Sequence, residues 1–202
     1  MIRMLQMILP VDNVRSMIKR LVSISRYLDL EQELLDFKAI YLISCLLIFV
    51  QLRVFKHSFI VNSPIDKVWE FYTDVKHLEI ITPKEMKLKI INATSEKITE
   101  GSEIWVEAKL IIVKTRWHSV IRSLKPYQYL DEMVKGPFKR WTHLHIFHST
   151  NDQKQTEILD EINFKIPYGR VGKLFEGYAY TQLQKLFDHR EAATFRTLQG
   201  NR

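Results

Sequence analysis

The sequence predicts an α+β domain in which a curved antiparallel sheet wraps around a long C-terminal helix. Three observations lead to this prediction: a β-rich run that leads into a helix start, a series of strand-like runs separated by turn residues, and a long helical pattern near the C-terminus. In that order, the elements form a sheet that curls around the final helix and leaves a cavity between the two layers.

The first part of this domain combines a strand with two short helices. Residues 54–61 (VFKHSFIV) are rich in residues that favour β-strands, and the run ends at Asn62. The following Ser63-Pro64-Ile65-Asp66 predicts a helix start, with a capping hydroxyl, a proline at the first helical position and a carboxylate at the third. A second short helical piece is expected to end near Ile81.

The rest of the domain is a meander closed by a helix. Six strand-like runs are predicted at residues 86–92, 103–110, 114–125, 127–135, 140–150 and 155–166. A helical pattern fills residues 170–195, and five apolar residues share one of its faces: Phe175, Ala179, Leu183, Leu186 and Phe187.

Residues 1–52 differ in composition from the rest, because they contain neither glycine nor histidine. Apolar residues spaced by three and four between Val14 and Leu28 predict a basic amphipathic helix, which suits either an anionic membrane surface or docking on the domain. The uncharged run 39–52 is too short to span a bilayer. We expect a buried or interfacial helix, or a start codon assigned too far upstream, so that residues 1–52 form an extension and residues 53–202 the main domain.

Composition narrows the function classes. The 202 residues are 46% hydrophobic and 26% charged, which is typical of a globular protein. The formal net charge is +7, but the basic residues are scattered and no nucleic-acid-binding motif occurs, so no nucleic-acid partner is predicted. The single cysteine, Cys45, excludes an intrachain disulfide and a Cys-rich zinc site. We expect a cytoplasmic protein, with attachment to the inner membrane face through residues 11–52 as the alternative.

The predicted hairpin turns indicate which side chains share a face of the sheet. The turn at 151–154 pairs Thr150 with Gln155, and the turn at 136–139 pairs Lys135 with Arg140. With a third turn at Pro126-Tyr127, one mostly apolar, concave face results: Trp117, Ser119, Ile121, Leu130, Glu132, Val134, Trp141, His143, His145, Phe147, Ile158, Asp160, Ile162 and Phe164.

Four polar residues interrupt this apolar face: His143, His145, Asp160 and Glu132. They are close enough on paired strands to hydrogen-bond, which suits a self-satisfied buried network, the polar end of an apolar cavity, or an acid–base centre. A metal site made of two histidines and a carboxylate is conceivable here, but the sequence does not clearly identify the third ligand. We therefore predict no metal and no cofactor. A β-bulge at Gly136-Pro137 would exchange Asp131 for Glu132 on this face.

Several motifs carry a family resemblance: Ser63-Pro64 after the first strand, the string Gly136-Pro137-Phe138…Trp141-x-His143-x-His145-x-Phe147, and Pro167-Tyr168-Gly169. Residues 53–198 resemble the SRPBCC superfamily, with its START and birch-pollen-allergen-like helix-grip fold. The branch most similar to this sequence is the ligand-binding branch related to polyketide cyclase/dehydrase and coenzyme-Q-binding START-type proteins.

The resemblance implies binding, with transfer or sequestration as further roles, of a hydrophobic small molecule such as a lipid, quinone or polyketide-like compound under the C-terminal helix. The predicted ligand-binding residues are Trp117, Ser119, Ile121, Glu132, Trp141, His143, His145, Phe147, Asp160, Phe164 and Tyr178. Some members of the superfamily are cyclases or dehydratases, so the alternative is an enzyme in which His143, His145 and Asp160, with Glu132, perform acid–base chemistry. The resemblance itself carries over no catalytic residue.

Overall fold

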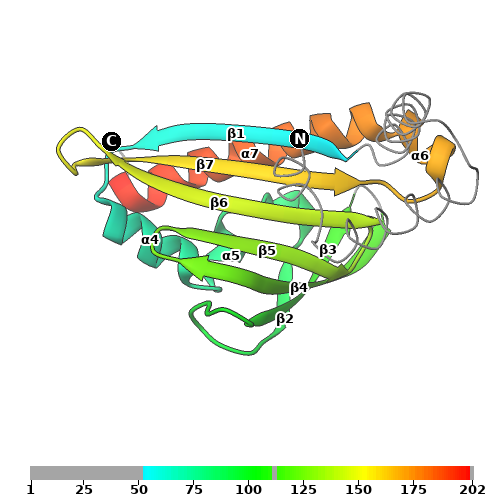
Figure 1. The fold of residues 1–202 in the computed structure, drawn as a ribbon, viewed down its shortest axis with the longest axis horizontal. Helices are drawn as coiled ribbons and strands as arrows, with labels where there is room; N and C mark the ends of the chain where they lie inside the picture. The colour runs from blue at the N-terminus through cyan, green and yellow to red at the C-terminus, as the bar shows by residue number, and fades with distance from the viewer. Residues whose placement is uncertain (1–51, 111–112, 201–202) are drawn as a thin grey trace, which may run out of the picture. The chain divides into compact units, whose positions relative to one another are not determined.

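The protein is built around one seven-stranded antiparallel sheet with the strand order β1-β7-β6-β5-β4-β3-β2. A computed structural model describes residues 52–110 and 113–200. The long helix α7 (Glu176–Gln199) lies behind β1 and β7 in Figure 1. This arrangement confirms the predicted fold class. The predictions for residues 1–51 lie outside the described residues.

The strands follow the predicted runs closely. Their bounds are β1 Arg53–Val61, β2 Lys89–Ala93, β3 Glu103–Leu110, β4 Val113–Lys125, β5 Gln128–Lys135, β6 Arg140–Thr150 and β7 Gln155–Lys165. The largest difference is at β2, which the sequence predicts to begin at residue 86 but which begins at Lys89, because Met86 is the last residue of a 3₁₀ turn over Lys84–Met86. Lys87 then takes a left-handed backbone conformation with a φ of 45°, which delays the start of the strand.

Two short helices follow β1: α4 (Ile65–Thr73) and α5 (His77–Ile80). The predicted capping role of Ser63 is wrong, because its hydroxyl makes no hydrogen bond with the described residues. Pro64 occupies the cap position, and its carbonyl accepts hydrogen bonds from the backbone N–H groups of Lys67 and Val68. Helix α4 therefore starts from the fixed φ of proline rather than from a side-chain cap.

The single helix expected over 170–195 is two helices, α6 (Gly169–Leu174) and α7. Phe175 stands at the break and is exposed, so it does not join the predicted apolar stripe. From Leu183 onward the stripe faces the interior, and Leu183 and Phe187 are buried. Helix α7 therefore closes the concave side of the sheet along its second half and exposes more apolar surface at its start.

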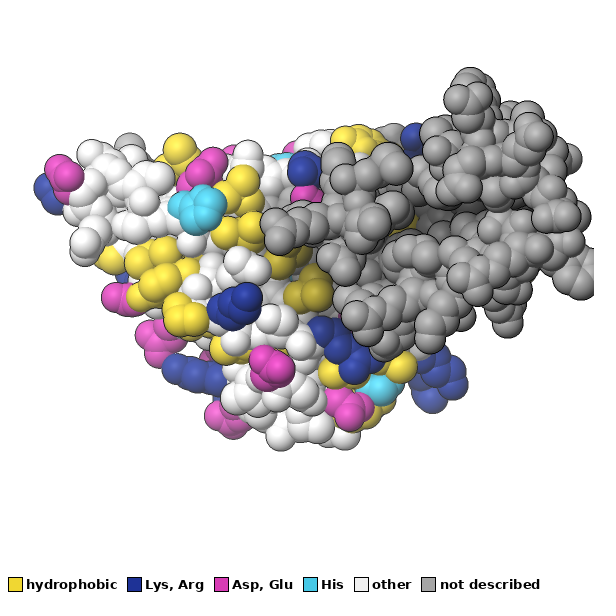
Figure 2. All heavy atoms as spheres, viewed as in Figure 1, with side chains coloured by type: hydrophobic (Ala, Val, Ile, Leu, Met, Phe, Trp, Pro, Cys, Tyr) yellow, Lys and Arg dark blue, Asp and Glu magenta, His cyan; other side chains and the backbone are white. Residues whose placement is uncertain are grey.

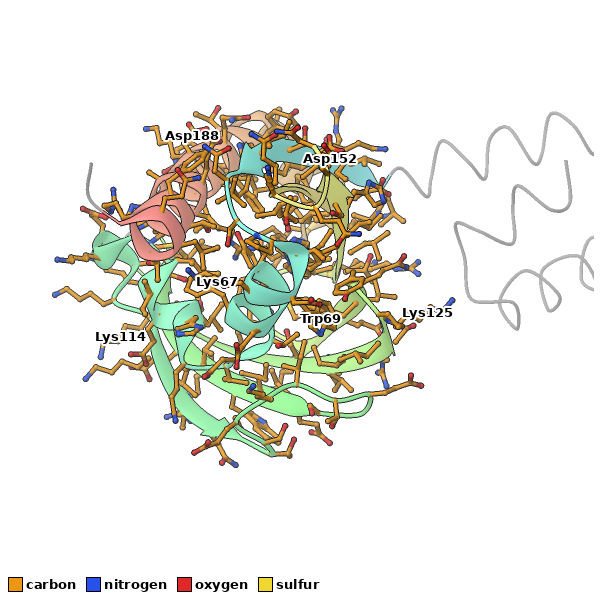
Figure 3. The ribbon with its side chains drawn as sticks, turned by 90° about the vertical axis from the view of Figure 1, so that its left-hand side faces the viewer. Lys67, Trp69, Lys114, Lys125, Asp152 and Asp188 are labelled. Atoms are coloured by element: carbon orange, nitrogen blue, oxygen red, sulfur yellow. The ribbon has the colours of Figure 1, made fainter. Side chains whose placement is uncertain are left out.

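The core consists of two clusters of buried side chains beneath the sheet. One joins α4 to the middle strands, and in Figure 3 Trp69 of α4 points toward the sheet. Its ring makes edge contacts with those of Tyr127, Tyr129 and Phe147, with centroids 5.6–6.0 Å apart. The other cluster packs α7 against the strand ends through residues that include Phe55, Trp141, Phe164, Leu183 and Phe187.

The outer face of the sheet carries mixed charges. Figure 2 shows basic and acidic side chains interspersed among apolar ones on this side, without a single-sign patch on the described surface in view. Within the described residues, none of the helices has the length and apolar character needed to cross a membrane.

The β6–β7 register is the predicted one. Thr150 pairs with Gln155 at the turn, and His145 pairs with Asp160 along the same ladder. The strands therefore place His143, His145 and Asp160 on the concave face, as the sequence predicted.

The predicted position of β5 is wrong by one residue. Asp131, not Glu132, lies opposite His143, and Glu132 lies opposite Thr142. Next to the β4–β5 turn the pairing is regular, but Arg122 has no partner in the ladder, and beyond it Ile121 pairs with Asp131. This irregularity in β4, with a matching offset at the β5–β6 turn, reverses the inside and outside of β5. Consequently Tyr129, Asp131 and Met133 face inward, and the predicted Leu130, Glu132 and Val134 do not.

Candidate functional site

A buried cluster of two histidines and a carboxylate lies on the concave face. His143 and His145 are two residues apart on β6, and Asp160 lies beside them on β7. All three side chains are at least 95% buried. His143 Nε2 is 2.8 Å from Asp160 Oδ1 in a hydrogen bond. His145 Nδ1 is 2.9 Å from the same oxygen but is not aligned as a hydrogen bond.

Asp131 approaches the other side of the two rings from β5. Its Oδ2 is 3.9 Å from His143 Nδ1 and 4.0 Å from His145 Nε2. Its side chain is 22% exposed, and its Oδ1 has no hydrogen-bond partner among the described residues. Each imidazole therefore has one nitrogen toward Asp160 and the other toward Asp131.

Arg190 of α7 brings a buried positive charge to the same cluster. Its Nη1 is 3.9 Å from Asp160 Oδ1, and its guanidinium carbon lies 4.6 Å from the centre of the Phe187 ring. On the other side, Tyr129 stacks on His145 with ring centroids 4.1 Å apart. The cluster is thus enclosed by aromatic surfaces, and Arg190 offsets the charge of Asp160.

The environment holds Asp160 ionised and the histidines neutral. Burial on its own would raise the pKa of Asp160, but the hydrogen bond from His143 and the approach of His145 outweigh it and hold that pKa well below its usual range. Burial, assisted by the neighbouring His145, lowers the pKa of His143 to about 4. Burial also lowers the pKa of His145.

These charge states fix the positions of the imidazole protons. An ionised carboxylate only accepts hydrogen bonds, so the proton of neutral His143 is on Nε2 and the lone pair is on Nδ1. In His145 the nitrogen near Asp160 is Nδ1, so by the same argument the proton is on Nδ1 and the lone pair is on Nε2. Both lone pairs point toward Asp131. Burial raises the pKa of Asp131, only partly opposed by His143 and Arg190.

Two adjacent cavities lie between the sheet and the helices. The smaller has a volume of about 170 Å³, and its lining includes Asp131, His143, His145 and Arg190. The larger has a volume of about 700 Å³ and a mostly apolar lining that begins beside α6. The two share four lining residues: Met86, Trp117, Trp141 and Leu186.

The structure brings most of the sequence-predicted site residues to these cavities. Trp117, Ser119, Ile121, Trp141, His143 and His145 line the smaller one, and Tyr178 lines the larger one. Phe147, Asp160 and Phe164 are buried in the core behind the lining. The prediction for Glu132 is wrong: it lies on the outer face, where its Oε2 accepts a hydrogen bond from Arg122 Nε at 2.6 Å.

Sequence reasoning did not predict Arg190 as part of the cluster, and it named Asp131 only as the alternative to Glu132. For Arg190 a signal was available, because it continues the buried spacing of Leu183 and Phe187 along α7. For Asp131 no clear signal existed, since alternate residues on β5 give two sets of similar character, each with two apolar residues and one acid.

Comparison with known proteins gives a result at the level of the fold. No family model and no curated protein matches the sequence. Solved structures do match, among them a START superfamily protein from Mycobacterium smegmatis at 8% identity, with a TM-score of 0.57 over 72% of this chain and 97% of that one. The Zhui aromatase/cyclase from a Streptomyces strain matches at 19% identity, with a TM-score of 0.54 over 74% and 93% of the two chains.

A third similar structure is norcoclaurine synthase from Thalictrum flavum, at 13% identity and a TM-score of 0.58 over 75% of this chain and 96% of that one. The chain has a helix-grip fold. In this helix-grip protein the cluster of His143, His145 and Asp160 lies between the sheet and α7. Its two histidines line the smaller cavity.

Proposed function

We propose that this helix-grip protein binds a hydrophobic small molecule, such as a lipid, quinone or polyketide-like compound, in the larger cavity. The observation that carries the proposal is the volume of about 700 Å³ together with its lining of aromatic and aliphatic side chains. Small-molecule sites have volumes of about 300–1,000 Å³ and mostly apolar walls with a few polar groups.

The polar cluster supports a defined orientation for this ligand. The smaller cavity shares Trp117 and Trp141 with the lining of the larger one, and its own lining includes His143 and His145. A ligand with a hydroxyl group at one end would bury its apolar part beside α7 and donate a hydrogen bond to an imidazole. Apolar burial would supply most of the affinity, and the imidazoles would select the end group.

The first test is native mass spectrometry of the full-length protein purified from its own host, to find a co-purifying lipid or quinone. The second uses a fluorescent apolar probe, 1-anilinonaphthalene-8-sulfonate, and its displacement by oleic acid. Ala179→Phe places a ring in the larger cavity, where Ala179 forms part of the lining, and should weaken probe binding at least tenfold.

Thr181→Phe is the matched control, because Thr181 is exposed on α7 and adds the same ring outside the cavity. Equal probe binding by the two variants, with both folded as judged by circular dichroism, would overturn the proposal.

The second candidate is a cyclase- or dehydratase-type enzyme. It is favoured by the buried pair of His143 and Asp160 next to a cavity, and an aromatase/cyclase is among the proteins of similar fold. The two candidates differ in the fate of the co-purified compound. Incubation with a binding protein returns the compound unchanged, whereas an enzyme converts it and His143→Gln removes the conversion while the compound still binds.

A further inference from the structure

Three atoms with lone pairs converge in the smaller cavity, and no hydrogen bond joins them to one another in the described part of the chain. They are His143 Nδ1, His145 Nε2 and Asp131 Oδ2, and all three atoms lie within 4.8 Å of one another. Asp131 Oδ2 is 3.9 Å from the first nitrogen and 4.0 Å from the second. Such an arrangement of acceptors is unfavourable unless something positive occupies the space between them.

The donor set and its separations suit a transition-metal ion. Two imidazole nitrogens and one carboxylate oxygen form the facial set that holds divalent first-row metals with other coordination positions open. Around an ion with bonds of about 2.1 Å, tetrahedral ligand atoms are about 3.4 Å apart. The two carboxylate–nitrogen distances need to shorten by roughly half an ångström, and the nitrogen–nitrogen distance, which is within 4.8 Å, by up to about 1.4 Å. Rotations of the three side chains would have to supply this closure.

Two further residues, Asp160 and Ser119, lie next to the three proposed ligands. Metal-binding histidines usually give their second ring nitrogen to a carboxylate, which fixes the tautomer and the ring orientation. Asp160 is placed to do this here: its Oδ1 accepts a hydrogen bond from His143 Nε2 at 2.8 Å and lies 2.9 Å from His145 Nδ1, which is not aligned as a hydrogen bond. Ser119, on the neighbouring strand β4, lines the same cavity as Asp131.

We propose that Asp131, His143 and His145 bind one divalent transition-metal ion, with Asp160 as the carboxylate that orients both imidazoles. The open coordination positions face the smaller cavity, whose lining includes all three ligands. No other group of three such side chains with this convergence occurs in the part of the chain that the structure describes. The metal site is complete in the protein alone, and with an ion bound, the hydroxyl group of the proposed ligand would meet the ion instead of an imidazole lone pair.

The test is a titration of the untagged, chelator-treated full-length protein with Co²⁺, and then with Zn²⁺ in competition, in the absence of any organic ligand. We expect one Co²⁺ per chain, visible absorption bands of a coordinated Co²⁺ ion, and their loss when Zn²⁺ is added. Isothermal titration calorimetry supplies the affinity, and X-ray absorption spectroscopy of the Zn²⁺ form supplies the numbers of nitrogen and oxygen ligands.

Variants at the ligands have matched controls close by in the sequence. Asp131→Asn and His143→Gln should each weaken Co²⁺ binding at least a hundredfold, whereas Asp160→Asn, which removes no ligand, should weaken it about tenfold to a hundredfold. Glu132→Gln and His148→Gln should leave the affinity unchanged, because Glu132 is on the outer face and His148 is exposed.

Two results would overturn the proposal: no Co²⁺ binding by folded wild-type protein, or binding that Asp131→Asn and His143→Gln leave intact, which would place the ion elsewhere. If His143→Gln fails to fold, Asp131→Asn decides alone, since it retains both histidines and their contacts with Asp160. Loss of binding to the apolar probe has no bearing on this result, so the failure of either proposal is distinguishable from that of the other.

Discussion

Asp131 and Asp160 are on opposite sides of the same two histidines, yet their environments differ. Asp160, on β7, is fully buried and has His143, His145 and Arg190 within 3.9 Å of one oxygen. Asp131, on β5, is partly exposed to a cavity and has imidazole nitrogens at 3.9–4.0 Å. The pKa of Asp160 is lowered although burial opposes ionisation, whereas burial dominates at Asp131 and raises its pKa.

The difference indicates a division of roles. Asp160 stabilises the fold as an anion because its neighbours donate hydrogen bonds and positive charge. Asp131 as an anion faces lone pairs, so it costs stability unless a proton or a cation joins it. A group that costs stability at its resting position and lines a cavity is a candidate for binding.

The largest effect is expected for Asp160→Asn. Both histidines and Arg190 lose the only carboxylate that all three approach, so we expect the free energy of unfolding to fall by about 3 kcal/mol at neutral pH. Urea denaturation of the chelator-treated protein measures it. A loss below about 1 kcal/mol would show that the carboxylate is not the stabilising centre.

Double-mutant cycles sharpen the comparison within the Asp160 side. His143→Ala and His145→Ala should each cost about 1–3 kcal/mol, and each should cost less when Asp160→Ala is already present. The coupling energy should be larger for His143, whose hydrogen bond is aligned, than for His145, whose nitrogen is equally near but not aligned. Additive effects at both histidines would contradict this reading of the cluster.

Asp131→Asn should have the opposite sign to Asp160→Asn. With metal removed, it should leave stability unchanged or raise it by up to about 1 kcal/mol, because a raised folded-state pKa means that the anion is penalised in the fold. That penalty applies above the folded-state pKa of Asp131 and disappears as the pH falls through it. The stability difference between variant and wild type should therefore shrink on acidification, as equilibrium unfolding at several pH values can show.

The smallest effect is expected for Glu132→Gln, one residue along β5. It removes an exposed ion pair with Arg122, and such pairs contribute about 0.2–1 kcal/mol that salt screens. We expect a loss of about 0.3 kcal/mol in low salt and less in high salt. A loss as large as that of Asp160→Asn would mean that Glu132, not Asp131, faces the interior.

The sequence was sufficient for much of this site, and the reason lies in the turns. The four-residue turn at 151–154 sets the register of β6 and β7, and their strict alternation then places His143, His145 and Asp160 together. The helix-grip architecture likewise follows from the order of strand and helix patterns, because a meander with one apolar face must be covered.

The position of Asp131 could not be predicted in the same way. The register of β5 depends on the irregularity at Arg122 and on the β5–β6 turn, and neither has a distinctive local pattern. Either set of alternate residues on β5 could form the inner face. The set of Tyr129, Asp131 and Met133 has the same polarity as the set of Leu130, Glu132 and Val134. The choice is made by packing: Tyr129 stacks on His145 and packs against Phe147, contacts that Leu130 would not reproduce.

The unpaired Arg122 decides which acidic side chain of β5 lines the cavity. If Arg122 took a place in the ladder, Ile121 would pair with Glu132, and Glu132 would replace Asp131 beneath the helix. Deleting Arg122 would instead keep the present pairs of Ile121 with Asp131 and of Ser123 with Leu130, so Asp131 would stay in the cavity. One extra residue in β4 thus selects between two neighbouring carboxylates without altering either of them.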